Sequence, residues 1–60
     1  MAKQIPENER KAVTYCRLAL NNLSKAFELT EHDKAIYLIS HAHSDICDII
    51  EIIQETEYEN

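Results

Sequence analysis

The chain has 60 residues, no glycine, one proline and a net charge of −5. This length excludes a second domain, and the lack of glycine and proline disfavours strands and tight turns, so an all-α unit is predicted. Two cysteines are too few for a disulfide framework. Residues 1–9 lack the apolar stretch of a signal peptide. No apolar run approaches the length of a membrane span, which is about 20 residues. The expected compartment is the cytoplasm.

The first predicted element is a helix over residues 7–29. Pro6 is tolerated in a first helical turn, and Glu7 and Glu9 face the positive end of the helix dipole. Apolar residues then recur in alternating steps of three and four, which defines a heptad seam with a positions at 13, 20 and 27 and d positions at 16, 23 and 30. On the flanking g position this helix carries only small side chains: Ala12, Ala19 and Ala26.

A short turn at 30–31 and a second helix over 32–57 follow. Thr30 is expected to be the N-cap of this helix, with Glu31 and Asp33 in its first turn. The second seam is formed by Ala35, Ile39, Ala42, Ile46, Ile49, Ile53 and Thr56. Further apolar residues flank it on both sides, with Ile36 and Ile50 at e and Leu38 and Ile52 at g.

Two helices joined by so short a turn must run antiparallel as a hairpin. The apolar face of the second helix is too wide for one partner helix, so we expect the hairpin to dimerise into a four-helix bundle. The alternatives are one long coiled coil bent at residue 30, and a hairpin that docks on a different protein. The expected dimer interface consists of Ile36, Leu38, Ile39, Ala42, Ile46, Ile49, Ile50, Ile52 and Ile53.

The densest group of reactive side chains lies in the middle of the second helix. His41 and Asp45 are four residues apart, as are His43 and Cys47, and this spacing allows two side chains to share one Zn²⁺. Two ligands are too few, although a twofold axis would supply another pair. The competing interpretation is that His43 and Asp45 form a polar layer that sets helix register, while His41 faces water and Cys47 is a surface thiol.

The outer face of the first helix is a candidate binding surface. Its f and c positions combine apolar and cationic side chains. This pattern is typical of a protein-binding surface, in which apolar side chains are surrounded by polar ones, or of a surface that contacts nucleic acid. Scattered surface apolar residues are the third interpretation. We refer to the following residues as the outer strip: Lys11, Tyr15, Leu18, Asn22, Lys25 and Leu29.

Catalysis is not expected. Acid pairs such as Glu51 and Glu55 lie on the solvent side, and the absence of glycine excludes a phosphate-binding loop. A bundle filled with leucine and isoleucine has no obvious concave pocket, and no cofactor is predicted. The seam position of Cys16 indicates a small buried hydrophobic residue.

The sequence resembles the Rop family of plasmid-encoded RNA-binding proteins that modulate antisense control of replication. The resemblance lies in the chain length, in the two-helix layout, and in three matches over nearly the whole chain: Met-x-Lys-Gln at 1–4, Glu-Leu at 28–29 and His-x-His-x-Asp at 41–45. It implies a homodimeric antiparallel four-helix bundle whose first helices grip a pair of kissing RNA loops.

The RNA-binding face of the Rop family uses lysines near both ends of the first helix and an exposed phenylalanine. Plain numbering matches the lysines to Lys3 and Lys25 and the phenylalanine to Thr14. Alignment by heptad instead matches the phenylalanine to Tyr15 and the second lysine to Ala26.

The expected function is therefore that of a small, acidic, non-enzymatic regulator or adaptor. We expect it to bind a protein partner through the outer strip of a hairpin dimer. The alternatives are a Rop-like RNA-binding modulator of plasmid or phage gene expression and a zinc-bridged structural dimer. Net acidity disfavours RNA, because six acidic residues follow the last basic one, Lys34.

Overall fold

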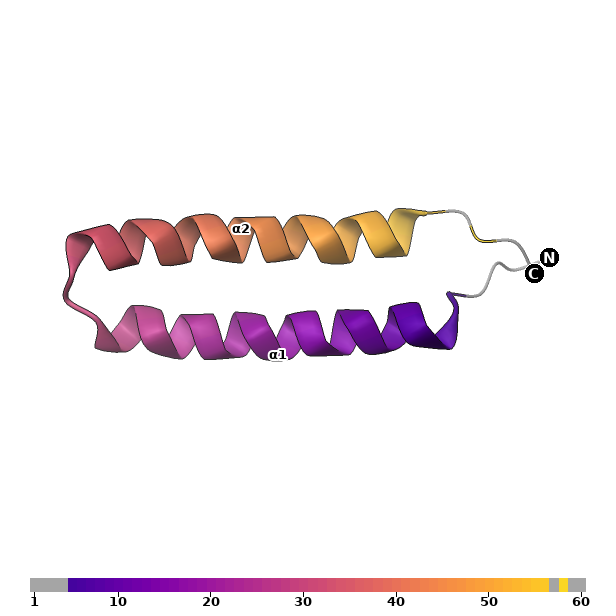
Figure 1. Ribbon diagram of the computed structural model, residues 1–60, viewed down its shortest axis with the longest axis horizontal. Helices are drawn as coiled ribbons and strands as arrows, with labels where there is room; N and C mark the ends of the chain where they lie inside the picture. Colours follow the sequence, from indigo (N-terminus) through magenta and orange to yellow (C-terminus); the bar gives the residue numbers. More distant parts are fainter. Residues whose placement is uncertain (1–4, 57, 59–60) are drawn as a thin grey trace.

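The computed structural model describes residues 5–56 and residue 58. It has two helices of 23 residues each, α1 over Glu7–Leu29 and α2 over Asp33–Glu55. The helices lie antiparallel side by side, and residues 30–32 connect them at one end (Figure 1). The described residues contain no strand, so the predicted all-α hairpin is confirmed. Neither of these helices is both long and apolar enough to cross a membrane.

The start of α1 agrees with the local signals around Pro6. This residue is the N-cap, with φ −54° and ψ 149°, and its carbonyl accepts the first backbone hydrogen bond from the Arg10 N–H at 3.0 Å. Glu7 and Glu9 occupy the first turn, where negative charge is favourable. These bounds of α1 coincide with the predicted 7–29.

The connection differs from the prediction at Thr30. The Thr30 N–H ends α1 by donating to the carbonyl of Ala26 at 3.0 Å, and its hydroxyl oxygen accepts from the backbone N–H of His32 at 3.2 Å. The N-cap of α2 is His32, whose Nδ1 accepts from the Ala35 N–H at 3.4 Å. The prediction that Thr30 caps α2 is wrong, because Thr30 closes α1 and the reversal needs two further residues. At its other end α2 stops at Glu55, with Thr56 as its C-cap, two residues before the predicted end at residue 57, which itself lies outside the described residues.

A better cap at position 32 should stabilise the hairpin. At 3.4 Å the bond to the Ala35 N–H is long, whereas asparagine is a strong N-cap residue. We expect His32→Asn to raise the free energy of unfolding by about 0.5–1 kcal/mol. Urea unfolding followed by circular dichroism measures this. His41→Asn, the same change in mid-helix, should lower stability slightly; an equal gain there would contradict the capping explanation.

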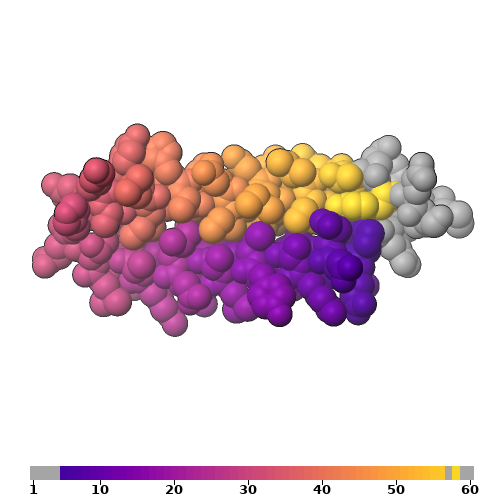
Figure 2. Space-filling view, viewed as in Figure 1, coloured from indigo at the N-terminus to yellow at the C-terminus, as the bar shows by residue number. Residues whose placement is uncertain are grey.

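Packing within one chain is shallow. Among the described residues only Val13 and Ile53 are buried, with 7% and 9% of their surface exposed. Most other seam residues are half-buried, and Phe27 and Ile49, both predicted to lie on the seam, are exposed. Side chains of the two helices meet along their whole length (Figure 2). A single hairpin therefore removes only part of its apolar surface from water.

The two helices meet off the centre of their seams. On α2 the e residues Ile36 and Ile50 are half-buried, whereas the g residues Leu38 and Ile52 are exposed. On α1 the pattern is reversed, because the g residues at 12 and 19 are half-buried and the e residues at 17 and 24 are exposed. The contact thus uses the g edge of α1 and the e edge of α2, which leaves the g edge of α2 uncovered.

Candidate interaction surface

One long face of the hairpin carries the e positions of both helices. A hollow of about 270 Å³ on this face is lined by Arg10, Val13, Arg17 and Thr14 of α1, Gln54 of α2, and Ile5. Residues 10 and 17 are at e on α1, and residue 54 lies at b, beside e, on α2. Because residues from both helices line one hollow, the e sides share this face, which we call the arginine face.

The opposite face, which we call the open face, carries the g and c positions of α1 and the g and d positions of α2. Its exposed large residues are Leu38, Ile49 and Ile52 on α2 and Tyr15 and Leu29 on α1. Between them lies the alanine edge of α1, where position 26 is exposed and positions 12 and 19 are half-buried. These five large residues are most of the exposed large hydrophobic side chains in the described part of the chain. A patch of this kind marks an interaction surface.

The structure divides the predicted dimer residues into two groups. The first group packs within the hairpin: Ile53 is buried, and the half-buried members are Ile36, Ile39, Ala42, Ile46 and Ile50. The second group, Leu38, Ile49 and Ile52, stays exposed on the open face. The second group is therefore the more accessible to another chain, because the e edge of α2 already contacts α1.

The outer strip consists of two rows that point in different directions. The f row, Lys11, Leu18 and Lys25, points directly away from α2, whereas the c row at 15, 22 and 29 is turned toward the open face. All six residues are exposed. The outer strip therefore borders the open face, although the heptad pattern suggested that the two surfaces were separate.

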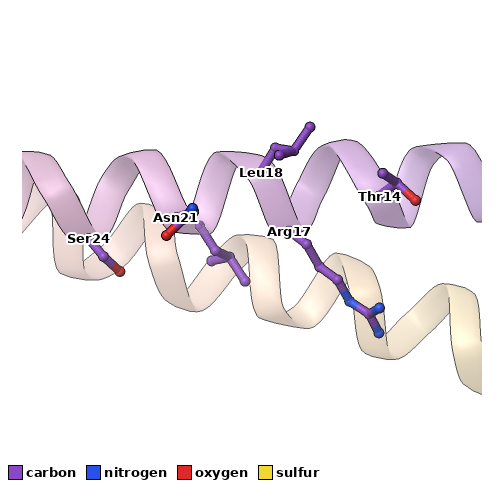
Figure 3. A pocket seen from close by; sticks show the side chains of 6 residues that line it. Thr14, Arg17, Leu18, Asn21 and Ser24 are labelled. Carbon is purple, nitrogen blue, oxygen red and sulfur yellow. The ribbon is translucent and has the colours of Figure 1, made fainter.

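A second hollow lies on α1 alone. It has a volume of about 580 Å³ and is lined by Thr14, Arg17, Leu18, Leu20, Asn21 and Ser24. In Figure 3 the Leu18 side chain points away from α2, and the Arg17 side chain reaches toward it. The heptad pattern predicts no hollow here, because four of the six lining residues lie at the b and e positions of α1, where the pattern is that of an ordinary solvated face.

Charge is distributed unequally between the helices. α1 holds the cations Arg10, Lys11, Arg17 and Lys25 against three glutamates, whereas α2 holds Lys34 against Asp33, Asp45, Asp48, Glu51 and Glu55. The hairpin thus has a mildly basic edge and an acidic edge. Arg17 lies on the arginine face, opposite Tyr15, so this cation does not flank the aromatic ring.

The reactive cluster on α2 is only partly assembled. The Cys47 Sγ lies 3.8 Å from the His43 Nδ1, as the spacing predicted. His41 contacts the Tyr37 ring instead, with ring centroids 4.4 Å apart. No three potential ligands gather in the described part of the chain. Cys16 is half-buried and Cys47 is exposed.

A chelator test separates the two interpretations of this cluster. Because one His/Cys pair supplies too few ligands for Zn²⁺, we expect EDTA to leave the thermal midpoint of the purified protein unchanged. The measurement is circular dichroism melting with and without EDTA. A fall in the midpoint that disappears in the His43→Ala variant would instead support the zinc-bridged dimer.

Comparison with protein-family models, with curated proteins and with solved structures finds no match to this chain. The two-helix hairpin is compatible with the Rop-like fold that the sequence motifs suggested. The assignment of a function therefore depends on the two surfaces of the hairpin.

Proposed function

We propose that this chain is a small non-enzymatic binding protein that forms a homodimeric four-helix bundle and holds a protein partner on the outer strip of α1. It acts as a regulator or adaptor, with no chemistry of its own. The observation that carries the proposal is the exposure of large apolar side chains beside lysines on one helix: Tyr15 is 70% and Leu29 is 83% exposed.

The dimer is supported by the shallow packing of one chain. Only Val13 and Ile53 are buried among the described residues, while a chain of 60 residues must offset roughly 1.5 kcal/mol of conformational entropy per ordered residue. Covering Leu38, Ile49 and Ile52 would remove further apolar surface from water. Apolar area removed from water contributes about 25 cal/mol per Å².

A protein partner is supported by the composition of the outer strip. Tyr15, Leu18 and Leu29 give it large apolar anchors, and Lys11 and Lys25 give it a cationic rim. Anchors within a polar rim are the usual anatomy of a protein interface. An amphipathic helix or an acidic peptide has the complementary chemistry.

RNA is the second candidate, and the basic character of α1 favours it. Arg10 and Arg17 line the hollow on the arginine face. Lys11 and Lys25 lie on the f row of the same helix. RNA binding through several phosphates would weaken steeply between low and moderate salt, whereas an apolar protein interface would not.

A double variant tests the proposed function. The target recovered by pull-down from the source cell, analysed for protein and RNA, is purified and titrated against Tyr15→Ala, Lys25→Ala. Loss of one anchor and one charge should weaken binding at least tenfold, since an anchor residue is worth about 1–2 kcal/mol. Sedimentation equilibrium must show that the variant is still a dimer.

The matched control is Lys34→Ala, Tyr37→Ala on α2, which removes the same two residue types from exposed positions outside the outer strip. This control should bind with unchanged affinity. Full binding by the Tyr15, Lys25 double variant would refute the protein version of the proposal and any RNA version that uses the outer strip.

A further inference from the structure

Asp45 occupies a place on the open face that bears on how two copies of the chain can pack together. It is exposed, and within the described residues no other charged side chain belongs to the rows that form the open face. It also lies near the middle of α2, which spans Asp33–Glu55, and therefore near the middle of the face. A carboxylate covered by another chain is costly unless it meets a hydrogen-bond donor.

The open face is large enough for a second copy of the chain. The helices that form this face are about 35 Å long and the hairpin is 15 Å wide, so the face offers on the order of 500–600 Å², near the lower end of the ~600–1,000 Å² that each partner buries in a stable interface. The face also has a row of large side chains on α2 beside a row of alanines on α1, so two copies can fit each other.

Two face-to-face arrangements keep every pair of neighbouring helices antiparallel. In the crossed arrangement, the twofold axis runs along the helices, each α1 lies on the α2 of the other copy, and both interhelical connections are at the same end. In the like-on-like arrangement, the axis runs across the helices, α1 lies on α1 and α2 on α2, and the connections are at opposite ends.

Asp45 distinguishes these arrangements. In the like-on-like arrangement, the middle of α2 lies on the middle of the other α2, and the two Asp45 carboxylates meet inside an apolar interface. In the crossed arrangement, Asp45 lies opposite the middle of α1, where the exposed Asn22 amide of the second copy can donate a hydrogen bond. Uncompensated like charges in an apolar interface are strongly unfavourable.

Side-chain size favours the same arrangement. In the crossed arrangement the large residues Leu38 and Ile52 face the alanine edge of the other copy, and interlocking of large with small side chains packs best. The charged rims do not separate the two arrangements, because the c row of α2 carries Lys34 as well as Asp48 and Glu55.

We propose that a second copy of this chain covers the open face in the crossed arrangement, and that Asp45 is the residue that selects it. This inference rests on the dimer of the proposed function. It adds that the two α1 helices occupy diagonal corners of the bundle, so the f rows of the two outer strips, which contain Lys11, Leu18 and Lys25, face opposite directions. The c row of each outer strip lies at the edge of the covered face. Each dimer then presents two separate partner sites, one on each side, each centred on an f row.

Electron spin resonance distance measurement tests the arrangement. A single spin label is attached at Glu31→Cys, in the exposed connection, with Cys16→Ala and Cys47→Ser removing the native thiols. The crossed arrangement places the two labels within about 25 Å, because neighbouring helices are about 10 Å apart. The like-on-like arrangement places them at opposite ends of helices that are about 35 Å long. A long distance alone would overturn the proposal.

The selecting role of Asp45 has its own test. In the labelled protein, Asp45→Leu should add a second population at the long distance, because neither arrangement then covers a charged group. Asp48→Leu, which removes a carboxylate from the rim, should leave the single short distance. An unchanged distribution in Asp45→Leu would refute the role of Asp45. A monomer in sedimentation equilibrium at tens of micromolar would instead refute the dimer itself, and with it the proposed function.

Discussion

Replacing Ile53 by alanine is expected to remove a large part of the free energy of unfolding of the protein. Ile53 is one of the two buried side chains in the described part of the chain. Truncating a buried isoleucine to alanine costs about 2–5 kcal/mol, whereas a domain of 60 residues has roughly 3–9 kcal/mol of stability in total. The measurement is the helical circular dichroism signal and its urea dependence.

The neighbouring residue provides a matched control. Ile52 has the same side chain on the same helical turn but is 64% exposed in a single hairpin. At low concentration, where chains are separate, Ile52→Ala should change the unfolding free energy by less than about 0.5 kcal/mol. Equal losses from both variants at low concentration would contradict the packing of α1 against the e edge of α2.

The second large effect expected is a dependence of thermal stability on protein concentration. If the open face is covered by another copy, folding is coupled to association, and the melting midpoint rises with concentration. Between about 1 µM and about 100 µM, complete coupling adds roughly 2.7 kcal/mol of stabilisation. Circular dichroism melting over this range measures the shift.

Charged residues on the open face should abolish this dependence. Leu38→Lys, Ile52→Lys places two ammonium groups where the second copy would pack, and burying them is strongly unfavourable. The variant should melt at one midpoint at every concentration. A wild-type midpoint that does not change with concentration would show that the hairpin is stable by itself, and would leave the open face to a different protein.

The bounds of the first helix and the seams of both helices follow from local chemistry. Pro6 with Glu7 and Glu9 is a sufficient start signal, and the alternating three- and four-residue spacing specifies helices of this length without any tertiary information. The exposure of His41 and Cys47 was also predicted from their heptad positions, and the structure confirms it. The N-cap of α2 was not predictable in the same way, because Thr30 and His32 both have side chains that accept a hydrogen bond.

What the sequence alone determined about this protein is its class: two amphipathic helices in a hairpin, with more apolar surface on the second than the first can cover. What only the tertiary structure decided is which part of that surface remains open. The heptad pattern treats Ile36 and Ile52 alike, since e and g flank the seam symmetrically. Packing removes the symmetry. The g edge of α1 carries only alanines and is narrow enough for the e edge of α2 to pack against it. Ile36 on the e edge is therefore half-buried, whereas Ile52 on the g edge stays exposed on the open face.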